Sequence, residues 1–207
     1  MNVIIPQWET LQSVFSGDTK WVFISSPWFS TEAIQRLMTF LPSEKLRRIQ
    51  KMEVWFRTSV EDYLTGMTDY GALAEFIERI HTELGQEKLE LYTSDSLHAK
   101  VYATDHQILI TSANLTKNGF EGNVEAGVIA DLDTSLRSQL DKVMAEQRQR
   151  LNEVSVDELT TFVRNLRHAV VDKYRAKVSD VFDSARKQLS LLSIKEEGLP
   201  HVKFPLR

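Results

Sequence analysis

The chain has 207 residues, of which 42% are hydrophobic and 26% are charged, and its net charge is −4. This composition is typical of a globular protein with one sizeable core, and it excludes a strongly basic protein that binds nucleic acid over its whole surface. The sequence has no cysteine, which excludes disulfides and thiolate metal sites, and no apolar run approaches the roughly 20 residues of a membrane-spanning helix.

Strand-like and helix-like segments alternate in residues 1–133. Apolar runs rich in β-branched and aromatic residues predict strands, and apolar residues spaced three and four apart predict helices. Pro42 ends the first helix, Asp69 caps the second, and Gly85 follows its end. In chain order, we expect a strand at 20–25, a helix at 31–41, a strand at 52–56, a helix at 69–84, and strands at 89–92, 98–103, 107–111 and 125–130. This alternation predicts an α/β fold with a layered α/β/α core and a mixed, substantially parallel sheet.

The texture of the sequence changes after Asp133. Residues 135–152 and 155–193 contain no Gly or Pro, which favours long helices. Ser155 and Glu158 have the spacing of a capping box at the start of the second stretch. Apolar residues then recur at three and four positions, which predicts one long amphipathic helix over about 155–193.

Charge also divides the chain into two expected parts, an α/β domain and a helical extension that ends in a loose tail. Residues 1–133 hold 11 Lys and Arg and 19 Asp and Glu, a net charge of −8, whereas residues 134–207 hold 14 and 10, a net charge of +4. Three arginines lie off the apolar stripe of the long helix: Arg164, Arg167 and Arg175. They form either a solvated charged face, or a basic surface for a polyanion or another subunit.

Residues 97–105, LHAKVYATD, place polar side chains in an expected buried strand. His98 and Lys100 are two residues apart, so on a strand they face the same side. A tight turn at residues 104–106 would bring Asn114, just past the next strand, near the His98 end. A nucleophilic imidazole, an ammonium and a carboxamide donor then converge, which suits attack on a phosphodiester without a metal ion.

A histidine nucleophile also needs an orienting partner on its second ring nitrogen, commonly a carboxylate. Glu125 is the expected partner because it is an acid within an apolar strand, where a carboxylate is tolerated only when it is paired. The alternative is an edge strand from which Glu125 points to solvent.

The spacing His98-x-Lys100-x4-Asp105, followed by Ser112-x-Asn114, resembles the HKD motif of the phospholipase D superfamily. Over about residues 20–130 the chain is similar to the single-motif nuclease branch, which includes bacterial endonucleases and metal-independent restriction enzymes. The segments that carry this similarity are ISSPWF at 24–29, FRTS at 56–59, LTGMTD at 64–69, HAKVY at 98–102, SANLTKNG at 112–119 and VEAGV at 124–128.

The resemblance implies a phospholipase D-like catalytic domain that needs no cofactor and no metal. It implies that His98 is the nucleophile, that Lys100 and Asn114 stabilise charge on the phosphate oxygens, and that Glu125 completes the catalytic set. The aspartate of the motif, here Asp105, is structural in this family and sits in a turn, where aspartate is expected anyway.

The sequence departs from the family pattern in two places. Thr111 stands where a glycine is usual before the serine, and the turn between Asp105 and Thr111 is shorter than usual. The added side chain would narrow the space beside the phosphate or shift the strand end. Either change would weaken activity, and a strong effect would make the chain a degenerate member.

The active site of the superfamily uses two motifs, with one histidine as nucleophile and the other as general acid. A second His-x-Lys occurs at His201-Val-Lys203, but only four residues follow it, so we interpret it as a chance match. Single-motif relatives dimerise, and the resemblance therefore implies a homodimer. In it, two copies of His98 complete one site about a two-fold axis.

Three further residues at strand ends are candidate phosphate contacts: Ser26, Arg57 and Ser112. Arg57 equally fits a strand-end arginine in solvent. Trp28 and Phe29 follow the first strand, where they either stack on a base or pack in the core or an interface.

The sequence therefore predicts a cytoplasmic, metal-independent nuclease that acts on nucleic acid, DNA rather than RNA, with a restriction or defence role by family analogy. We expect no secretory signal, because the N-terminal residues lack a basic region and a cleavage site. The acidic first part opposes polyanion binding, so the basic extension or a separate protein partner would deliver the substrate. One alternative is a phospholipase D-type lipid phosphodiesterase, although we find no membrane-facing patch. The other is a catalytically weak binding or assembly module with this fold.

Overall fold

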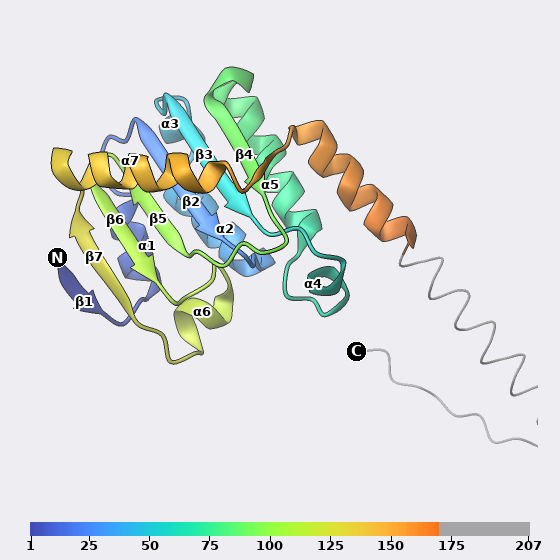
Figure 1. Cartoon of the computed structure of the whole chain (residues 1–207), viewed down its shortest axis with the longest axis horizontal. Coiled ribbons are helices and arrows are strands. Elements are labelled where there is room, and N and C mark those ends of the chain that lie inside the picture. Colours follow the sequence, from blue (N-terminus) through green and yellow to red (C-terminus); the bar gives the residue numbers. More distant parts are fainter. Residues whose placement is uncertain (170–207) are drawn as a thin grey trace, which may run out of the picture. The chain divides into compact units, whose positions relative to one another are not determined.

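The structure is a computed structural model that describes residues 1–169. In this part of the chain an eight-stranded sheet has the order β1-β7-β6-β5-β2-β3-β4-β8 (Figure 1). The strands are β1 (Asn2–Ile4), β2 (Trp21–Ser26), β3 (Lys51–Phe56), β4 (Leu89–Thr93), β5 (Val101–Thr104), β6 (Gln107–Thr111), β7 (Gly127–Asp131) and β8 (Asn152–Glu153). The helices are α1 (Trp8–Val14), α2 (Thr31–Phe40), α3 (Ser43–Leu46), α4 (Val60–Leu64), α5 (Tyr70–Leu84), the 3-10 turn η1 (Gln86–Lys88), α6 (Lys117–Glu121) and α7 (Thr134–Arg148). A further helix occupies residues 156–169.

The sheet mixes parallel and antiparallel neighbours. β2 pairs in parallel with β3, and β3 with β4, whereas the other five pairings among the described strands are antiparallel. β5 and β6 are joined by a tight turn, which is too short for the crossover that parallel strands need. The mixed α/β class is confirmed, but the sheet is mostly antiparallel rather than substantially parallel.

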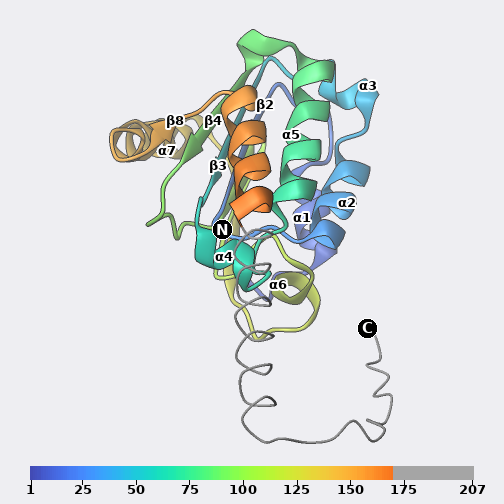
Figure 2. The ribbon, with the colours of Figure 1, turned by 90° about the vertical axis from the view of Figure 1, so that its right-hand side faces the viewer.

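Helices cover both faces of the sheet, with α7 alone on one side in the described part of the chain (Figure 2). The larger core lies on the opposite side, where α1, α2, α5 and the last described helix bury residues such as Leu11, Leu37 and Ile77. α7 packs against a second cluster that includes Trp21 and Trp55. The expected α/β/α layering is therefore confirmed.

The compact unit that contains the sheet ends at Leu166 rather than at residue 133. Met144 of α7 is buried against the sheet, and β8 extends the sheet by pairing with β4. Residues 134–166 therefore belong to the same core as the strands. The boundary expected after residue 133 fails because the apolar side of α7 covers a sheet face that would otherwise meet water.

The capping box at the start of the last described helix is present. Ser155 Oγ accepts from Glu158 N at 3.2 Å, and Glu158 Oε2 accepts from Ser155 N at 2.7 Å. The first apolar residues of the expected stripe are buried: Leu159, Val163 and Leu166. The rest of the expected helix and tail, with Arg175 and His201, falls in residues 170–207, outside the described residues. Among the helices that are described, none is long and apolar enough to cross a bilayer.

Two strands start later than expected, and this moves the candidate residues out of the sheet. β5 begins at Val101 because a turn, closed by a hydrogen bond from Leu97 N to Ser94 O at 3.4 Å, takes the preceding chain out of the ladder. β7 begins at Gly127. His98, Lys100 and Glu125 therefore precede their strands rather than lie within them.

Candidate active site

Three candidate segments meet at one end of the sheet, near α6 (Figure 1). Lys100 O accepts a hydrogen bond from Thr111 N at 3.1 Å, which aligns the start of β5 with the end of β6. Ser112 N then donates to Ala126 O at 2.9 Å and aligns the end of β6 with the start of β7. The segments that carry His98, Ser112 and Asn114, and Glu125 therefore lie in neighbouring rows, as the sequence predicts.

His98 and Lys100 contact each other directly. Lys100 Nζ lies 2.9 Å from His98 Nε2 and donates to His98 O, also at 2.9 Å. An ammonium can only donate, so this contact requires the lone pair on Nε2 and places the ring proton on Nδ1. His98 is exposed, whereas Lys100 is buried. Burial lowers the pKa of Lys100 below its ordinary value, and the Glu125 carboxylate opposes that shift.

Glu125 lies in the loop before β7 rather than in a strand. Its Oε2 accepts from Ser112 Oγ, and its Oε1 accepts from Asn123 Nδ2 at 3.1 Å. Ser112 Oγ in turn accepts from Ala126 N at 3.0 Å. Within residues 1–169 the hydrogen bonds of Glu125 go to Ser112 and Asn123, and none goes to His98. Asn123 is a site residue that the sequence did not single out, although it directly precedes the VEAGV segment.

Asn114 is 9% exposed, and its Oδ1 has no hydrogen-bond partner in the described part of the chain. Thr116 caps the first turn of α6. This turn includes Gly119, which lies close to the Asn114 backbone. A Cβ at position 119 would stand 2.3 Å from Asn114 O, closer than real contacts allow. Gly119 is therefore needed for the path of the Asn114 loop. It is the last residue of SANLTKNG, and that segment is the only sign of its importance in the sequence.

Thr111, which departs from the family pattern, is accommodated by a second glycine. Its Oγ1 donates to Ala126 O at 3.0 Å and accepts from Ala113 N at 3.0 Å. Gly127 lies opposite, where an added Cβ would stand 3.1 Å from Thr111 Oγ1. The threonine side chain therefore occupies room that Gly127 leaves, which is a pairing that the sequence analysis missed.

Two other candidates are tied up in contacts with their own chain. The carboxylate of Asp105 accepts from the backbone of Lys20 at 2.9 Å and of Trp21 at 2.7 Å, so it links the β5–β6 turn to the start of β2. Arg57 Nε lies 3.1 Å from Asp62 Oδ2, an ion pair whose alignment falls short of a hydrogen bond. A phosphate would have to compete with Asp62 for this arginine.

Ser26 is fully buried, unlike a phosphate contact. Its hydroxyl donates to Trp28 O at 2.8 Å and accepts from Leu115 N at 2.9 Å. It therefore joins two loops, one of which carries Asn114, and burial rules out the expected direct contact with substrate in this structure. Phe29 is core, whereas Trp28 is partly exposed.

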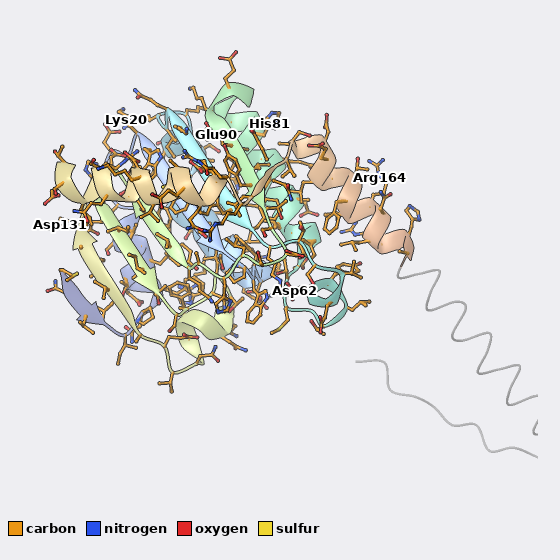
Figure 3. All side chains as sticks on the ribbon, in the orientation of Figure 1. Lys20, Asp62, His81, Glu90, Asp131 and Arg164 are labelled. Carbon is orange, nitrogen blue, oxygen red and sulfur yellow. The ribbon has the colours of Figure 1, made fainter. Side chains whose placement is uncertain are left out.

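The described arginines of the last helix, Arg164 and Arg167, are both exposed. Arg164 stands on the solvent side of this helix (Figure 3). Within residues 1–169 it makes no hydrogen bond or ion pair with the residues around His98, so its expected role depends on a ligand that extends beyond them.

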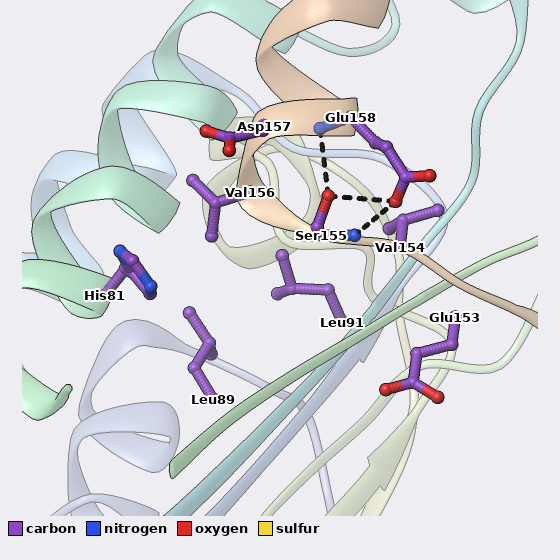
Figure 4. Close-up of a pocket in the computed structure, with 9 residues that line it drawn as sticks. All are labelled: His81, Leu89, Leu91, Glu153, Val154, Ser155, Val156, Asp157 and Glu158. Carbon is purple, nitrogen blue, oxygen red and sulfur yellow. Dashed lines mark hydrogen bonds between the residues drawn. The ribbon is translucent and has the colours of Figure 1, made fainter. Parts of the chain in front are cut away.

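A cavity of about 330 Å³ opens beside the candidate residues, and its lining includes Trp28, Asn114 and Asn123. A larger cavity of about 580 Å³ lies between α5, β4 and the start of the last described helix, lined by residues such as His81 and Glu158 (Figure 4). It contains none of the predicted site residues, so cavity size alone would point away from the chemistry. Across residues 1–169, no cluster of three or more His, Asp or Glu could hold a metal ion.

The match to a known family covers the same part of the chain. Residues 64–148 match the family model described as cardiolipin synthase, PLD-like domain. This part of the chain is therefore similar to phospholipase D-like domains. The match spans His98, Lys100, Asn114 and Glu125, and it crosses residue 133, in agreement with the compact unit. The comparison with curated proteins finds no match.

Solved structures share the phospholipase D-like fold. A phosphatidylserine synthase from Haemophilus influenzae Rd KW20 superposes with a TM-score of 0.58 at 19% identity, over 84% of this chain and 43% of that protein. The chain thus spans less than half the length of that synthase. Nuc from Salmonella typhimurium, a phospholipase D family member, has a TM-score of 0.48 at 15% identity, over 74% of this chain and 97% of its own. NucT from Helicobacter pylori has a TM-score of 0.44 at 18% identity, over 72% and 94%.

Proposed function

We propose that the chain is a phosphodiester hydrolase that cleaves nucleic acid, without a metal ion, through a covalent phosphohistidine on His98. The observation that carries the proposal is the contact between the buried Lys100 ammonium and Nε2 of the exposed His98. It holds at the surface an imidazole whose Nε2 carries no proton, beside a cation that can bind a phosphate oxygen. That combination supports nucleophilic attack on phosphorus.

In the proposed reaction, His98 Nε2 forms a bond to phosphorus while the bond to the leaving oxygen breaks. Lys100 and the Asn114 amide donate to the non-bridging oxygens, and Ser112 would have to turn its hydroxyl from Glu125 to the phosphate to add a third donor. His98 of the partner subunit gives the leaving oxygen a proton. Water then attacks phosphorus, returns a proton to that histidine, and the bond from phosphorus to nitrogen breaks.

The active assembly in this proposal is a homodimer. One copy supplies a single His-x-Lys among the described residues, and a hydrolysis of this type needs a second proton-transfer group. Apolar side chains near the candidate residues support a subunit contact there: Val124, next to Glu125, is fully exposed, and Ile110 on β6 is 52% exposed. Exposed apolar groups beside a half-complete site favour a two-fold partner.

DNA is the substrate we propose, rather than RNA, with Arg164, Arg167 and Arg175 as contacts to its backbone and Arg57 as a second, competing phosphate ligand. The acidic character of residues 1–133 weakens general attraction to a polyanion. A separate protein partner would raise the local substrate concentration, and a weakly attractive core of this kind would suit a regulated restriction or defence role.

A lipid phosphodiesterase or phosphatidyl transferase is the second candidate. The observation that favours it is the description of the matching family model as cardiolipin synthase. The shared chemistry is a phosphodiester attacked by histidine, so only the group beside the phosphate differs.

One experiment separates these functions. The purified protein is incubated with plasmid, single-stranded DNA, RNA and anionic phospholipid vesicles in EDTA, beside the His98→Ala variant. We expect DNA cleavage that persists in EDTA and falls by at least about 10³-fold in His98→Ala, as when a nucleophile is removed. Hydrolysis of the phospholipid alone would favour the lipid phosphodiesterase. If the unmodified protein cleaves none of these substrates, the binding or assembly module is favoured.

A further inference from the structure

The cavity beside Asn114 has a polar wall that its own chain does not satisfy. It has a volume of about 330 Å³. Asn114, which is nine-tenths buried, belongs to its lining, and Asn114 Oδ1 has no partner among the described residues; the buried Nε1 of Trp28, in the same lining, also has none. Native proteins pair nearly all buried polar atoms, so unpaired atoms in two residues that line one cavity point to a ligand that pairs them when it binds.

The other walls of the cavity combine flat apolar surface with amides. Trp28 contributes an aromatic side chain, and Met67, which is 41% exposed, contributes a thioether. Asn118 and Asn123 add donors and acceptors, and Lys117 and Glu32 add one charge of each sign. An aromatic surface beside amide groups suits a planar ring with donors and acceptors on its edge, which is the chemistry of a nucleobase.

The cavity is tied to the candidate catalytic residues through shared side chains. Asn123, in its lining, donates to Glu125 at 3.1 Å. Ser26 Oγ binds both Trp28 O at 2.8 Å and Leu115 N at 2.9 Å, so the Trp28 loop and the Asn114 loop are held as one unit. A base in this cavity would therefore adjoin the phosphate that His98 attacks.

We propose that this cavity binds the nucleobase next to the scissile phosphate, with Trp28 stacking on the ring and Asn114 Oδ1 accepting from its edge. The proposal rests on the proposed function and narrows it to a nuclease that needs an unstacked base on one side of the bond. Trp28 and Met67 are then specificity residues, because a paired, stacked base cannot enter such a cavity.

The test combines a substrate change with a protein change. A short single-stranded DNA carries one phosphodiester, with its other linkages replaced by methylphosphonates. It is compared with two versions in which the base 5′ or 3′ of that bond is replaced by an abasic tetrahydrofuran. With the unmodified protein, removal of one of these bases is expected to lower kcat/KM about tenfold, the size of one stacking contact, and removal of the other to change it little.

Trp28→Ala should lower kcat/KM on the intact DNA by the same factor of about ten, and base removal should then have no further effect. Trp28→Phe, which keeps an aromatic ring, should restore most of the dependence on the base. Unchanged circular dichroism and melting would show that the variants fold. Equal losses on intact and abasic DNA in Trp28→Ala, or no effect of base removal on the unmodified protein, would overturn the proposal.

The same series distinguishes failure of the cavity proposal from failure of the proposed function. Dissociation constants of the three DNAs are measured by fluorescence anisotropy with the unmodified protein in EDTA and with His98→Ala. If no DNA is cleaved but the affinity for the base depends on Trp28, the base-binding proposal is supported and the proposed nuclease activity is rejected. Cleavage that depends on His98 but is indifferent to both bases would do the reverse.

Discussion

Lys100 contacts the same nitrogen of His98 that is proposed to attack phosphorus. Its ammonium lies against the Nε2 lone pair of His98, 2.9 Å away. A phosphate oxygen carries more negative charge than an imidazole nitrogen, so an arriving diester would draw the ammonium to itself and uncover Nε2. The same cation would first protect the nucleophile and then stabilise the charge that its attack creates.

The pH dependence of activity should report the burial of Lys100. Because burial lowers its pKa below the ordinary 10.5, kcat/KM is expected to fall with rising pH before 10.5 is reached. Lys100→Arg keeps its charge to much higher pH, so the alkaline fall should move upward even if the maximal rate is lower. The measurement is a pH–rate profile of both proteins.

Loss of stability through Lys100 would not produce the same alkaline fall in kcat/KM. Between the lowered pKa and 10.5 the unfolded chain binds more protons than the folded one at Lys100, so this residue makes stability rise with pH. An alkaline fall at the same pH in both proteins would remove Lys100 as its cause.

Gly119 should matter more for activity than a typical helix glycine. In Gly119→Ala the new Cβ would meet Asn114 O at 2.3 Å, so the Asn114 loop must move. We expect kcat/KM to fall at least about tenfold, because small misplacements of a catalytic group have large effects. Gly122→Ala is the matched control, since its nearest neighbour is the flexible Asn118 side chain at 3.2 Å. Similar activities of the two variants would argue against the role of Gly119.

At the residue scale, sequence spacing located the polar set but could not assign every contact. His98 and Lys100 were paired because two residues separate them, although neither lies in a strand. The burial of Ser26 escaped prediction, since its partner Leu115 is 89 residues away. Gly127 escaped as well, because its relation to Thr111 exists only in the register of β6 and β7.

Among the elements, α7 is fixed to the sheet by a buried carboxylate. Glu53, in the middle of β3, is fully buried and accepts from Trp55 Nε1 at 2.7 Å and from Arg148 Nε at 2.7 Å. The Glu53 carboxylate raises the pKa of Arg148 through this hydrogen bond. A buried charge is tolerated only when it is paired, so the last turn of α7 is needed where it lies.

Arg148→Ala should destabilise the fold strongly. It leaves the Glu53 charge buried with one partner fewer, and we expect the free energy of unfolding to fall by about 3 kcal/mol in urea titrations. Arg47→Ala, which removes a surface ion pair with Glu83, should change it by less than about 1 kcal/mol. Replacing Glu53 and Arg148 together with Leu and Met should recover much of the loss. Equal effects of the two alanine variants would contradict this account.

Long periodic elements were predictable, and short ones were not. β2, β3, β4 and α5 lie within about two residues of their expected bounds because apolar periodicity fixes them locally. β1 and β8 have three and two residues, too few for a pattern, and form only because remote strands pair with them. The direction of strand pairing could not be predicted either, because a short apolar run is compatible with both parallel and antiparallel pairs.

For the whole molecule, the proposed site is half of an assembly. The described chain exposes one His98, and the proposed hydrolysis uses two. The apolar side chains beside it, Val124 and Ile110, would leave water in the assembled form. Light scattering at micromolar concentration is expected to give twice the mass of the chain.

Mixed dimers should reveal a shared site. If both histidines act on one phosphate, a dimer of one unmodified chain and one His98→Ala chain is inactive. After subunit exchange, an equal mixture should keep about a quarter of the activity, the share of dimers with two intact chains. Activity that stays near one half after the subunits have exchanged would show that each chain works alone.

The outer strands of the sheet have a consequence for behaviour at high concentration. A long exposed edge offers unpaired backbone groups to any neighbouring chain and so promotes fibrous aggregation. Here the two edges are β1, with three residues, and β8, with two. Within residues 1–169, so little free edge leaves no template of useful length, and fibrous aggregation through these two strands is therefore not expected.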